Sequence, residues 1–172
     1  MDYKKLIRDL PDYPVPGVTF RDLSTLWNNP RAFSLVLDEM YELIKDLKID
    51  KVLGIEARGF IFGSVLAYKL GAGFVPVRKR KKLPWKVYSQ EYELEYGTDH
   101  IEIHQDAVSV GERVLIVDDL LATGGTTAAT VQLLSHFSNI EIVGAAYLVE
   151  LAFLEGRKID RKSTRLNSSH RI

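Results

Sequence analysis

An uninterrupted apolar run, Val114-Leu115-Ile116-Val117, stands directly before two acidic residues, Asp118 and Asp119. A strand whose apolar side chains point to both sides must be covered on both faces, which is typical of parallel sheets flanked by helices. The run therefore favours an α/β fold. In such a fold the two carboxylates would lie at the exposed carboxyl end of a buried strand.

The rest of the chain repeats this alternation of strand and helix. Apolar residues at helical spacing predict an amphipathic helix that enters at Pro30 and continues to about Leu47. Further strands are predicted over residues 51–55, 74–77 and 141–149, and further helices over 60–70 and 127–137. We therefore expect a parallel sheet flanked by helices.

Two segments depart from this alternation. The stretch Pro14-Val15-Pro16-Gly17 excludes regular structure and predicts an ordered arm over about residues 1–29. In residues 78–106, aromatic and apolar side chains alternate with polar ones on either side of Gly97-Thr98-Asp99. This pattern predicts a β-hairpin beside the carboxyl edge of the sheet, where it would act as a lid over a ligand.

The segment after the two aspartates, Ala122-Thr123-Gly124-Gly125-Thr126-Thr127, predicts a phosphate-binding loop that opens a helix. Glycines let the backbone approach phosphate oxygens, and the helix N-terminus and threonine hydroxyls supply donors. Alone, the loop is equally typical of an ordinary strand-to-helix turn, but the paired carboxylates match neighbouring sugar hydroxyls. Because GxxxxGK[ST] and GxGxxG are absent, a ribose 5-phosphate is favoured over a nucleoside triphosphate or a dinucleotide.

Composition narrows the classes of function further. Lys and Arg number 23, as do Asp and Glu, so there is no net charge to attract nucleic acid or an anionic membrane. The chain has no cysteine, and its four histidines lack the spacing of a metal site. Neither a signal peptide nor an apolar run of about 20 residues is visible, so we expect a soluble, cytoplasmic protein.

The segment from Val114 to Thr127 resembles the phosphoribosyl pyrophosphate (PRPP) signature of type I phosphoribosyltransferases. Three further stretches resemble the members of that family that act on adenine: Pro16 to Asp22, Gly54 to Phe60 and Leu94 to Asp99. The resemblance covers about Leu10 to Gly156, in the family's order and spacing. It implies a single domain over residues 1–159 with an N-terminal hood and a hairpin lid.

The resemblance also implies which residues contact PRPP. They are Asp118 and Asp119 at the ribose hydroxyls, Ala122, Thr123, Gly124, Gly125 and Thr126 around the 5-phosphate, and Arg58, Arg78 and Lys82 at the pyrophosphate. Taken alone, the basic cluster over residues 78–82 is as typical of a solvated charge run. Lys81 stands where the family commonly has glycine, which leaves the roles of Lys81 and Arg80 open.

The remaining matched positions concern catalysis and the base. Glu95 matches the catalytic-loop glutamate of the family, with Arg58 as its partner in catalysis, and Tyr96 would help to cover the site. Thr19, Phe20 and Arg21 match the adenine-binding edge, where Phe20 would stack on the base. The pattern alone also allows a second interpretation, in which Glu95 is an outward residue of an alternating strand.

The activity implied is the transfer of the 5-phosphoribosyl group from PRPP to adenine, giving AMP and pyrophosphate in purine salvage. Mg²⁺ would be bound mainly through PRPP and pyrophosphate, and the family implies a homodimer. Two alternatives stay open: a different base (hypoxanthine, guanine, xanthine or orotate), or a non-catalytic sensor of PRPP or purines. A sensor is expected to carry a DNA-binding helix module, for which the residues before the first long helix are too few.

The C-terminal segment departs from the family pattern. After Gly156 the chain is strongly polar, and the further apolar strand that the family has there is not visible. We therefore expect residues 160–172 to be a disordered and non-native tail, which leaves open whether activity is retained.

Overall fold

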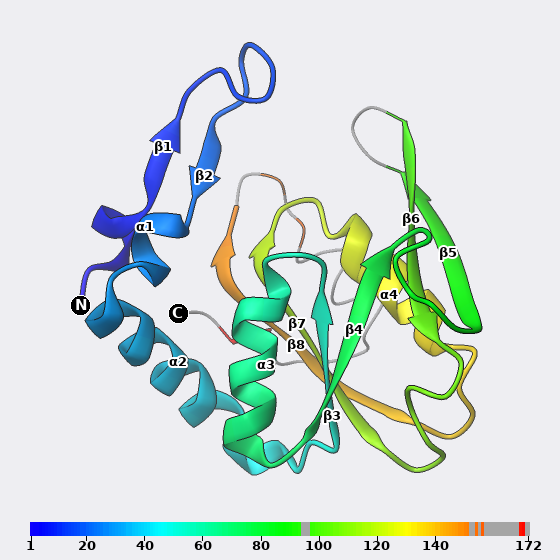
Figure 1. Cartoon of the computed structure of the whole chain (residues 1–172). Helices are drawn as coiled ribbons and strands as arrows, with labels where there is room; N and C mark the ends of the chain where they lie inside the picture. The colour runs from blue at the N-terminus through cyan, green and yellow to red at the C-terminus, as the bar shows by residue number, and fades with distance from the viewer. Residues whose placement is uncertain (94–96, 152–153, 155, 157–168, 171–172) are drawn as a thin grey trace. The chain divides into compact units, whose positions relative to one another are not determined.

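The computed structural model describes residues 1–93, 97–151, 154, 156 and 169–170 (Figure 1). Glu95 and Tyr96 lie outside the described residues. The chain divides into two compact units, Met1–Glu39 and Met40–Ile172. The predicted arm over residues 1–29 falls within the first unit.

The first unit is a small hairpin followed by helices. Its elements are η1 (Tyr3–Leu6), β1 (Arg8–Leu10), β2 (Phe20–Asp22), α1 (Ser24–Trp27) and the start of α2 (Pro30–Ile44), which continues into the second unit. β1 and β2 pair antiparallel, and the proline-rich segment forms the connection between them. The predicted helix entry at Pro30 is confirmed, and the Asn29 side chain accepts a hydrogen bond from the Ala32 N–H at 3.1 Å.

The second unit is built on one mixed sheet. Its elements are η2 (Lys45–Leu47), β3 (Lys51–Ile55), α3 (Gly59–Leu70), β4 (Gly73–Lys79), β5 (Val87–Glu93), β6 (Thr98–His104), β7 (Arg113–Leu121), α4 (Gly125–Leu134), β8 (Glu141–Glu150) and β9 (Ser169–His170). The strand order is β5-β6-β4-β3-β7-β8-β9. Every predicted strand and helix of the second unit is present, so the expectation of an α/β fold is confirmed.

The order of the four central strands decides where a ligand can bind. β3 and β7 are parallel neighbours, and the chain passes from β3 through α3 to β4 on one side, and from β7 through α4 to β8 on the other. Since such crossovers are right-handed, the two helices cover opposite faces of the sheet. A crevice is therefore expected between the carboxyl ends of β3 and β7, where the direction of winding reverses.

The central strands are buried on both faces, as the apolar run predicted. Val114 and Ile116 belong to a core cluster with Leu133 and Leu134 of α4. Leu115 and Val117 alternate with them and are 1 % and 0 % exposed. α3, whose buried residues include Phe62 and Leu66, contacts β3 and β7. Packing on both faces holds the ends of β3 and β7 at fixed positions.

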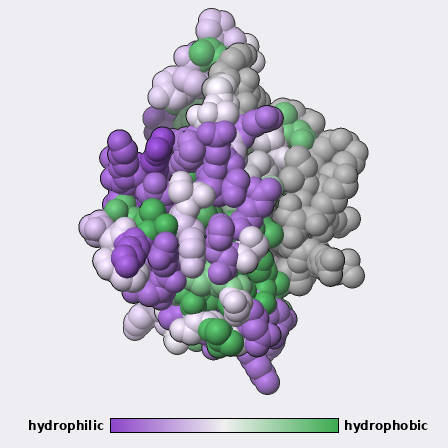
Figure 2. Space-filling view, turned by 90° about the vertical axis from the view of Figure 1, so that its right-hand side faces the viewer, coloured by the Kyte–Doolittle hydropathy of each residue, from purple (hydrophilic) through white to green (hydrophobic). Residues whose placement is uncertain are grey.

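The predicted hairpin forms, but it joins the sheet instead of standing beside it. β5 and β6 pair antiparallel, and β6 pairs antiparallel with β4 at Arg78↔Glu102 and Lys79↔Ile101. The sheet is therefore mixed, with the antiparallel hairpin extending its parallel strands at this edge. The cause is burial, because Ile101 and Ile103 of β6 belong to the core cluster. Seen from the side of β5 and β6, the surface is mainly hydrophilic (Figure 2).

Of the predicted tail over residues 160–172, the structure describes Ser169 and His170. These two residues form β9, which pairs parallel with Ala145 and Ala146 of β8. The polar sequence did not predict a strand there. Backbone pairing to a sheet edge does not require apolar side chains, so hydropathy gives no signal for it.

Candidate active site

The loop from β7 to α4 has the geometry of a phosphate site. Gly124 precedes the helix with φ of +85°, a left-handed conformation in which another side chain would be strained. α4 begins at Gly125, two residues before the predicted start at Thr127, so Gly125 and Thr126 belong to its first turn. The N–H groups of a first turn have no partner within the helix, which suits this end of α4 to an anion.

Asp118 and Asp119 lie within β7 and not beyond its end. Asp119 is 2 % exposed, and its Oδ2 lies 2.9 Å from Nε of Arg58 in an ion pair. The N–H of Asp119 donates to Oδ1 of Asp118 at 2.9 Å. The expectation of two exposed carboxylates is therefore wrong for Asp119, because β7 pairs with β8 as far as Leu121 and encloses that side chain.

Burial raises the pKa of both carboxyl groups. For Asp118 the loss of hydration is the largest cause, and the neighbouring charge of Asp119 adds to it. For Asp119 the loss of hydration again dominates and outweighs the positive charge of Arg58. Groups that donate hydrogen bonds to the ionised pair, as sugar hydroxyls do, would stabilise it.

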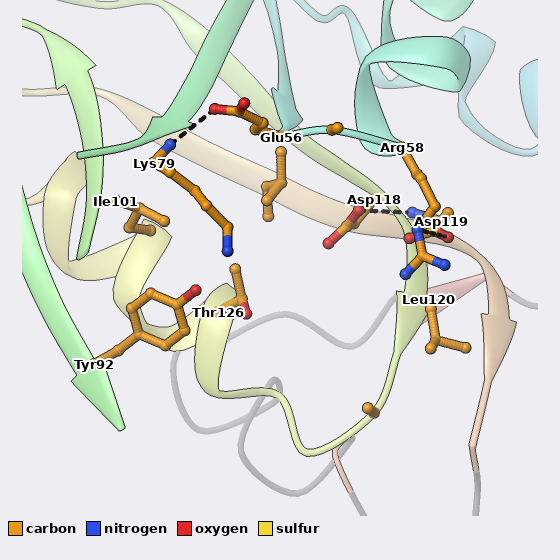
Figure 3. A pocket seen from close by; sticks show the side chains of 12 residues that line it. Glu56, Arg58, Lys79, Tyr92, Ile101, Asp118, Asp119, Leu120 and Thr126 are labelled. Atoms are coloured by element: carbon orange, nitrogen blue, oxygen red, sulfur yellow. Dashed lines mark hydrogen bonds and ion pairs between the residues drawn. The ribbon is translucent and has the colours of Figure 1, made fainter. Parts of the chain in front are cut away.

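A cavity of about 250 Å³ opens at the carboxyl ends of β3 and β7, at the expected crevice (Figure 3). It is lined by residues 55–58, 118–120, 122 and 126, and by Lys79, Tyr92 and Ile101. The amino group of Lys79 and the hydroxyl of Tyr92 point toward Thr126 on one side, and Asp118 and Arg58 lie on the other (Figure 3). Carboxylates, cations and hydroxyls thus surround one space.

Besides the Arg58–Asp119 pair, two further ion pairs hold cations around this cavity. Arg78 forms a bidentate pair with Glu56, with both nitrogen–oxygen distances 3.1 Å. Burial by itself would raise the pKa of Glu56, but the bonds from Arg78 and from the Lys79 N–H outweigh it and hold that pKa below its usual range. Lys79 Nζ lies 3.0 Å from Asp99, and this hydrogen bond raises the pKa of Lys79.

Comparison with known proteins identifies the family. The phosphoribosyl transferase domain family matches residues 22–170. The chain is 60% identical over 158 residues to adenine phosphoribosyltransferase of Acaryochloris marina. The matched region covers 92% of each of the two chains. The chain belongs to the adenine phosphoribosyltransferase family.

Solved structures of adenine phosphoribosyltransferases have the same fold. That from Thermoanaerobacter pseudethanolicus is 45% identical, with a TM-score of 0.89 over 99% of this chain and 95% of the other. That from Trypanosoma brucei was determined with AMP, pyrophosphate and ribose-5-phosphate. It is 25% identical, with a TM-score of 0.87 over 98% of this chain and 75% of the other.

The PRPP residues predicted from the adenine phosphoribosyltransferase pattern are partly brought together. Those that line the cavity are Arg58, Asp118, Asp119, Ala122 and Thr126. Thr123 and Gly124 lie in the same loop and Gly125 begins α4, but none of the three lines the cavity, and Thr123 is exposed. Arg78 and Lys82 do not line it: Arg78 contacts Glu56, and its Nη1 donates to the Lys82 carbonyl at 3.1 Å. Glu95 and Tyr96 fall outside the described residues.

The predicted adenine-binding residues belong to the first unit. Phe20 begins β2, and its ring meets that of Tyr13 edge-on, with the centroids 5.3 Å apart. Arg21 forms an ion pair with Asp9 on the neighbouring strand β1. Thr19 is exposed directly before β2.

Seven lining residues are not among the site residues predicted from the sequence: Ile55, Glu56, Ala57, Lys79, Tyr92, Ile101 and Leu120. Glu56 stands in the matched stretch Gly54 to Phe60 and Lys79 in the basic cluster 78–82, so their place directly after a strand or at its end was an available signal. In the sequence, Tyr92 and Ile101 stand out only as members of a pattern in which aromatic or apolar residues alternate with polar ones. Their place on the cavity depends on β6 pairing with β4, which local patterns do not reveal.

Among the residues that the structure describes, no group of three or more His, Cys, Asp or Glu side chains is arranged to hold a metal ion. Within the same residues, no helix combines the length and apolar character needed to cross a membrane.

Proposed function

We propose that this chain transfers the 5-phosphoribosyl group of PRPP to adenine and releases AMP and pyrophosphate. One observation carries the proposal: the Asp118–Asp119 pair, the Arg58 guanidinium and the first turn of α4 meet in a single cavity. Acceptors for sugar hydroxyls, a cation for pyrophosphate and a helix N-terminus for a phosphate are the three groups that PRPP requires. The ligands of the trypanosome relative support it.

In this proposal the second unit holds PRPP. Asp118 and Asp119 accept hydrogen bonds from the ribose hydroxyls, and the loop from Ala122 to Thr126 encloses the 5-phosphate. Arg58 binds the pyrophosphate. Arg78 and Lys82 contribute positive charge from the end of β4 and the loop after it, and Tyr96 covers the site.

The reaction breaks the bond from the sugar C1′ to pyrophosphate oxygen, and the electron pair leaves with pyrophosphate. The cationic sugar is then attacked by a ring nitrogen of adenine, and the proton on that nitrogen passes to the released pyrophosphate or to water. The protein must hold both substrates in line, stabilise the leaving anion and exclude water. We propose that Arg58 stabilises the leaving pyrophosphate, and that Glu95 stabilises the charge that develops at the sugar or base.

Mg²⁺ enters this scheme with PRPP as part of the substrate. The cavity offers carboxylates beside the proposed ribose and pyrophosphate positions. Mg²⁺ keeps several waters and takes few protein ligands when phosphates are present. When bound, the ion would neutralise the pyrophosphate oxygens, while Arg58 orients the same group.

The deciding experiment is an assay with labelled adenine and PRPP, with and without Mg²⁺, that follows AMP. We expect AMP and pyrophosphate to form in equal amounts and only when Mg²⁺ is present. Binding of PRPP without turnover would favour a sensor of the same fold and count against an enzyme.

Base specificity is tested by competition between single bases. Adenine should be used far better than hypoxanthine, because a site built to accept from an amino group leaves a polar group unpaired against an oxo group. We assign the site to Thr19, Phe20 and Arg21. Comparable values of kcat/KM for the two bases would contradict adenine specificity.

We further propose a homodimer in the cytoplasm. The family resemblance supports the dimer. The absence of cysteine fits a reducing compartment. Light scattering of the purified protein measures its oligomeric state directly.

A further inference from the structure

Glu56 is an acidic side chain on the wall of a cavity proposed to receive an anion. It follows β3 directly and lines the cavity beside Arg58, with 16% of its side chain exposed. The bonds from Arg78 and from the Lys79 N–H keep its pKa low, so it is ionised at neutral pH. A carboxylate there repels pyrophosphate, which calls for a compensating role.

The contacts of Glu56 indicate that role. Its two oxygens accept bonds from Nε and Nη2 of Arg78, both at 3.1 Å. One of these oxygens also accepts the Lys79 N–H at 2.9 Å (Figure 3). The carboxylate thus holds one side chain and the adjacent backbone together. Both groups come from β4, so Glu56 joins the loop after β3 to the end of the neighbouring strand.

Arg78 is held from three sides. Besides the pair with Glu56, its Nη1 donates to the Lys82 carbonyl at 3.1 Å, and its guanidinium carbon lies 6.0 Å from the centre of the Phe60 ring. The Lys82 contact ties the loop after β4 to the same guanidinium. Lys79, next in the chain, points its amino group into the cavity (Figure 3).

We propose that Glu56 is a positioning residue for PRPP, acting through Arg78 and the Lys79 backbone. It orients the end of β4 so that the positive charge of residues 78–82 faces the pyrophosphate. The attraction between that positive charge and pyrophosphate outweighs the repulsion between pyrophosphate and the Glu56 carboxylate. The inference rests on the proposed function, because it takes pyrophosphate as the anion.

The Glu56→Gln variant separates this role from a simple charge effect, because the two predict changes of opposite sign. Removing a negative charge from an anion site would strengthen PRPP binding. Loss of positioning should instead weaken it about tenfold, with the KM for adenine unchanged. PRPP affinity is measured by titration calorimetry. PRPP binding as tight as in the wild type, or tighter, overturns the proposal.

A double-variant cycle tests whether Glu56 acts through Arg78. In an Arg78→Met background there is no guanidinium to orient, so Glu56→Gln should cause little further loss of PRPP affinity. Independent losses that add in the double variant would overturn the coupling. Glu56→Asp keeps the charge and shortens the reach. It should also weaken PRPP binding, and an unchanged affinity would contradict positioning.

Glu141→Gln is the matched control, because it also breaks a Glu–Arg ion pair, with Arg113. That pair lies at the amino ends of β7 and β8, away from the cavity, so PRPP affinity should not change. If Glu141→Gln weakened PRPP binding as much as Glu56→Gln, the effect would be general and the proposal would fail.

The outcome can be distinguished from failure of the proposed function. A wild-type chain that binds PRPP but makes no AMP contradicts the enzyme assignment. The affinities of the Glu56 variants then still decide whether Glu56 positions the anion site. A folded wild-type chain that does not bind PRPP overturns both.

Discussion

At the scale of single residues, Asp118 and Asp119 lower the stability of the fold at neutral pH, while they supply the acceptors proposed to bind PRPP. Each carboxyl has a raised pKa, chiefly because burial disfavours the charged form. The folded protein therefore binds the carboxyl protons of Asp118 and Asp119 more tightly than the unfolded chain does. Its stability should fall as pH rises from about 4, the ordinary aspartate pKa, through the raised pKa values, and then level off.

The Asp118→Asn variant tests the effects on stability and on PRPP binding. An amide keeps the oxygen that accepts the Asp119 N–H but removes one buried charge. Without PRPP, the variant should be more stable at neutral pH by roughly 1 kcal/mol, which raises Tm by about 2–4 °C. Its affinity for PRPP should fall about tenfold or more, because an acceptor for a ribose hydroxyl is weakened.

Thermal unfolding between pH 4 and pH 8 and PRPP titration measure the two effects. The fall in stability with rising pH should be smaller in Asp118→Asn than in the wild type. The exposed Asp106→Asn is the control, and it should change neither quantity. Unchanged PRPP affinity in Asp118→Asn would contradict the ribose assignment.

Glu95 gives a second test at the scale of one residue. If it stabilises charge in the transition state, Glu95→Gln should lower kcat by about 100-fold and leave PRPP binding nearly unchanged. The control is Glu93→Gln, an exposed residue at the end of β5. Equal turnover in the two variants would identify Glu95 as an outward strand residue without a catalytic role.

At the scale of elements, the start of α3 must come unusually close to β7. A Cβ added to Gly59 would lie 2.7 Å from the backbone oxygen of Val117 and 3.0 Å from Oδ1 of Asp118. Such contacts cannot be relieved by turning a flexible side chain, because the first is with backbone. Glycine at this position therefore lets the loop after β3 approach the carboxylates of β7.

The Gly59→Ala variant should consequently be less stable by about 1–3 kcal/mol and should bind PRPP more weakly, since the methyl group displaces β7 or α3 at the cavity. Urea unfolding measures the first effect. Ser64→Ala, on an exposed position of the same helix, should change stability by less than about 0.5 kcal/mol. A stable Gly59→Ala variant with normal affinity would show that α3 can shift without harm to the site.

Elements whose evidence is local were predicted from the sequence, and long-range pairings were not. The run from Val114 to Val117 and the glycine–threonine loop each carry their own hydropathy or backbone signal. The antiparallel pairing of β6 with β4 depends on strands separated along the chain, and so does the Glu56–Arg78 pair. A basic cluster reveals its charge but not its partner, so Arg78 was assigned to pyrophosphate although its side chain contacts Glu56.

At the scale of the whole molecule, the proposed binding functions are divided between the two units. Thr19, Phe20 and Arg21 belong to Met1–Glu39, and the cavity residues belong to Met40–Ile172. The sequence places the base-binding match and the PRPP match in separate segments of the chain. It leaves open whether Phe20 stacks on adenine or anchors the arm.

The Phe20→Ala variant decides between these two roles. If Phe20 stacks on the base, its loss should raise the KM for adenine about tenfold, since base–aromatic stacking contributes about 1–3 kcal/mol. The affinity for PRPP should stay unchanged, because the cavity that would hold PRPP is formed by the other unit. Steady-state kinetics with each substrate varied in turn, and PRPP titration, measure the two quantities.

Tyr13→Ala is the matched control for Phe20→Ala, because it removes the other partner of the same edge-on ring contact. An anchoring role predicts that both variants loosen the β1–β2 hairpin and raise the KM for adenine equally. A stacking role predicts a large effect from Phe20→Ala and a small one from Tyr13→Ala, because Tyr13 would not touch the base. Equal effects of the two variants would therefore assign Phe20 to the hairpin. A rise in KM for adenine confined to Phe20→Ala, with PRPP affinity intact, is the result expected if the first unit recognises the base.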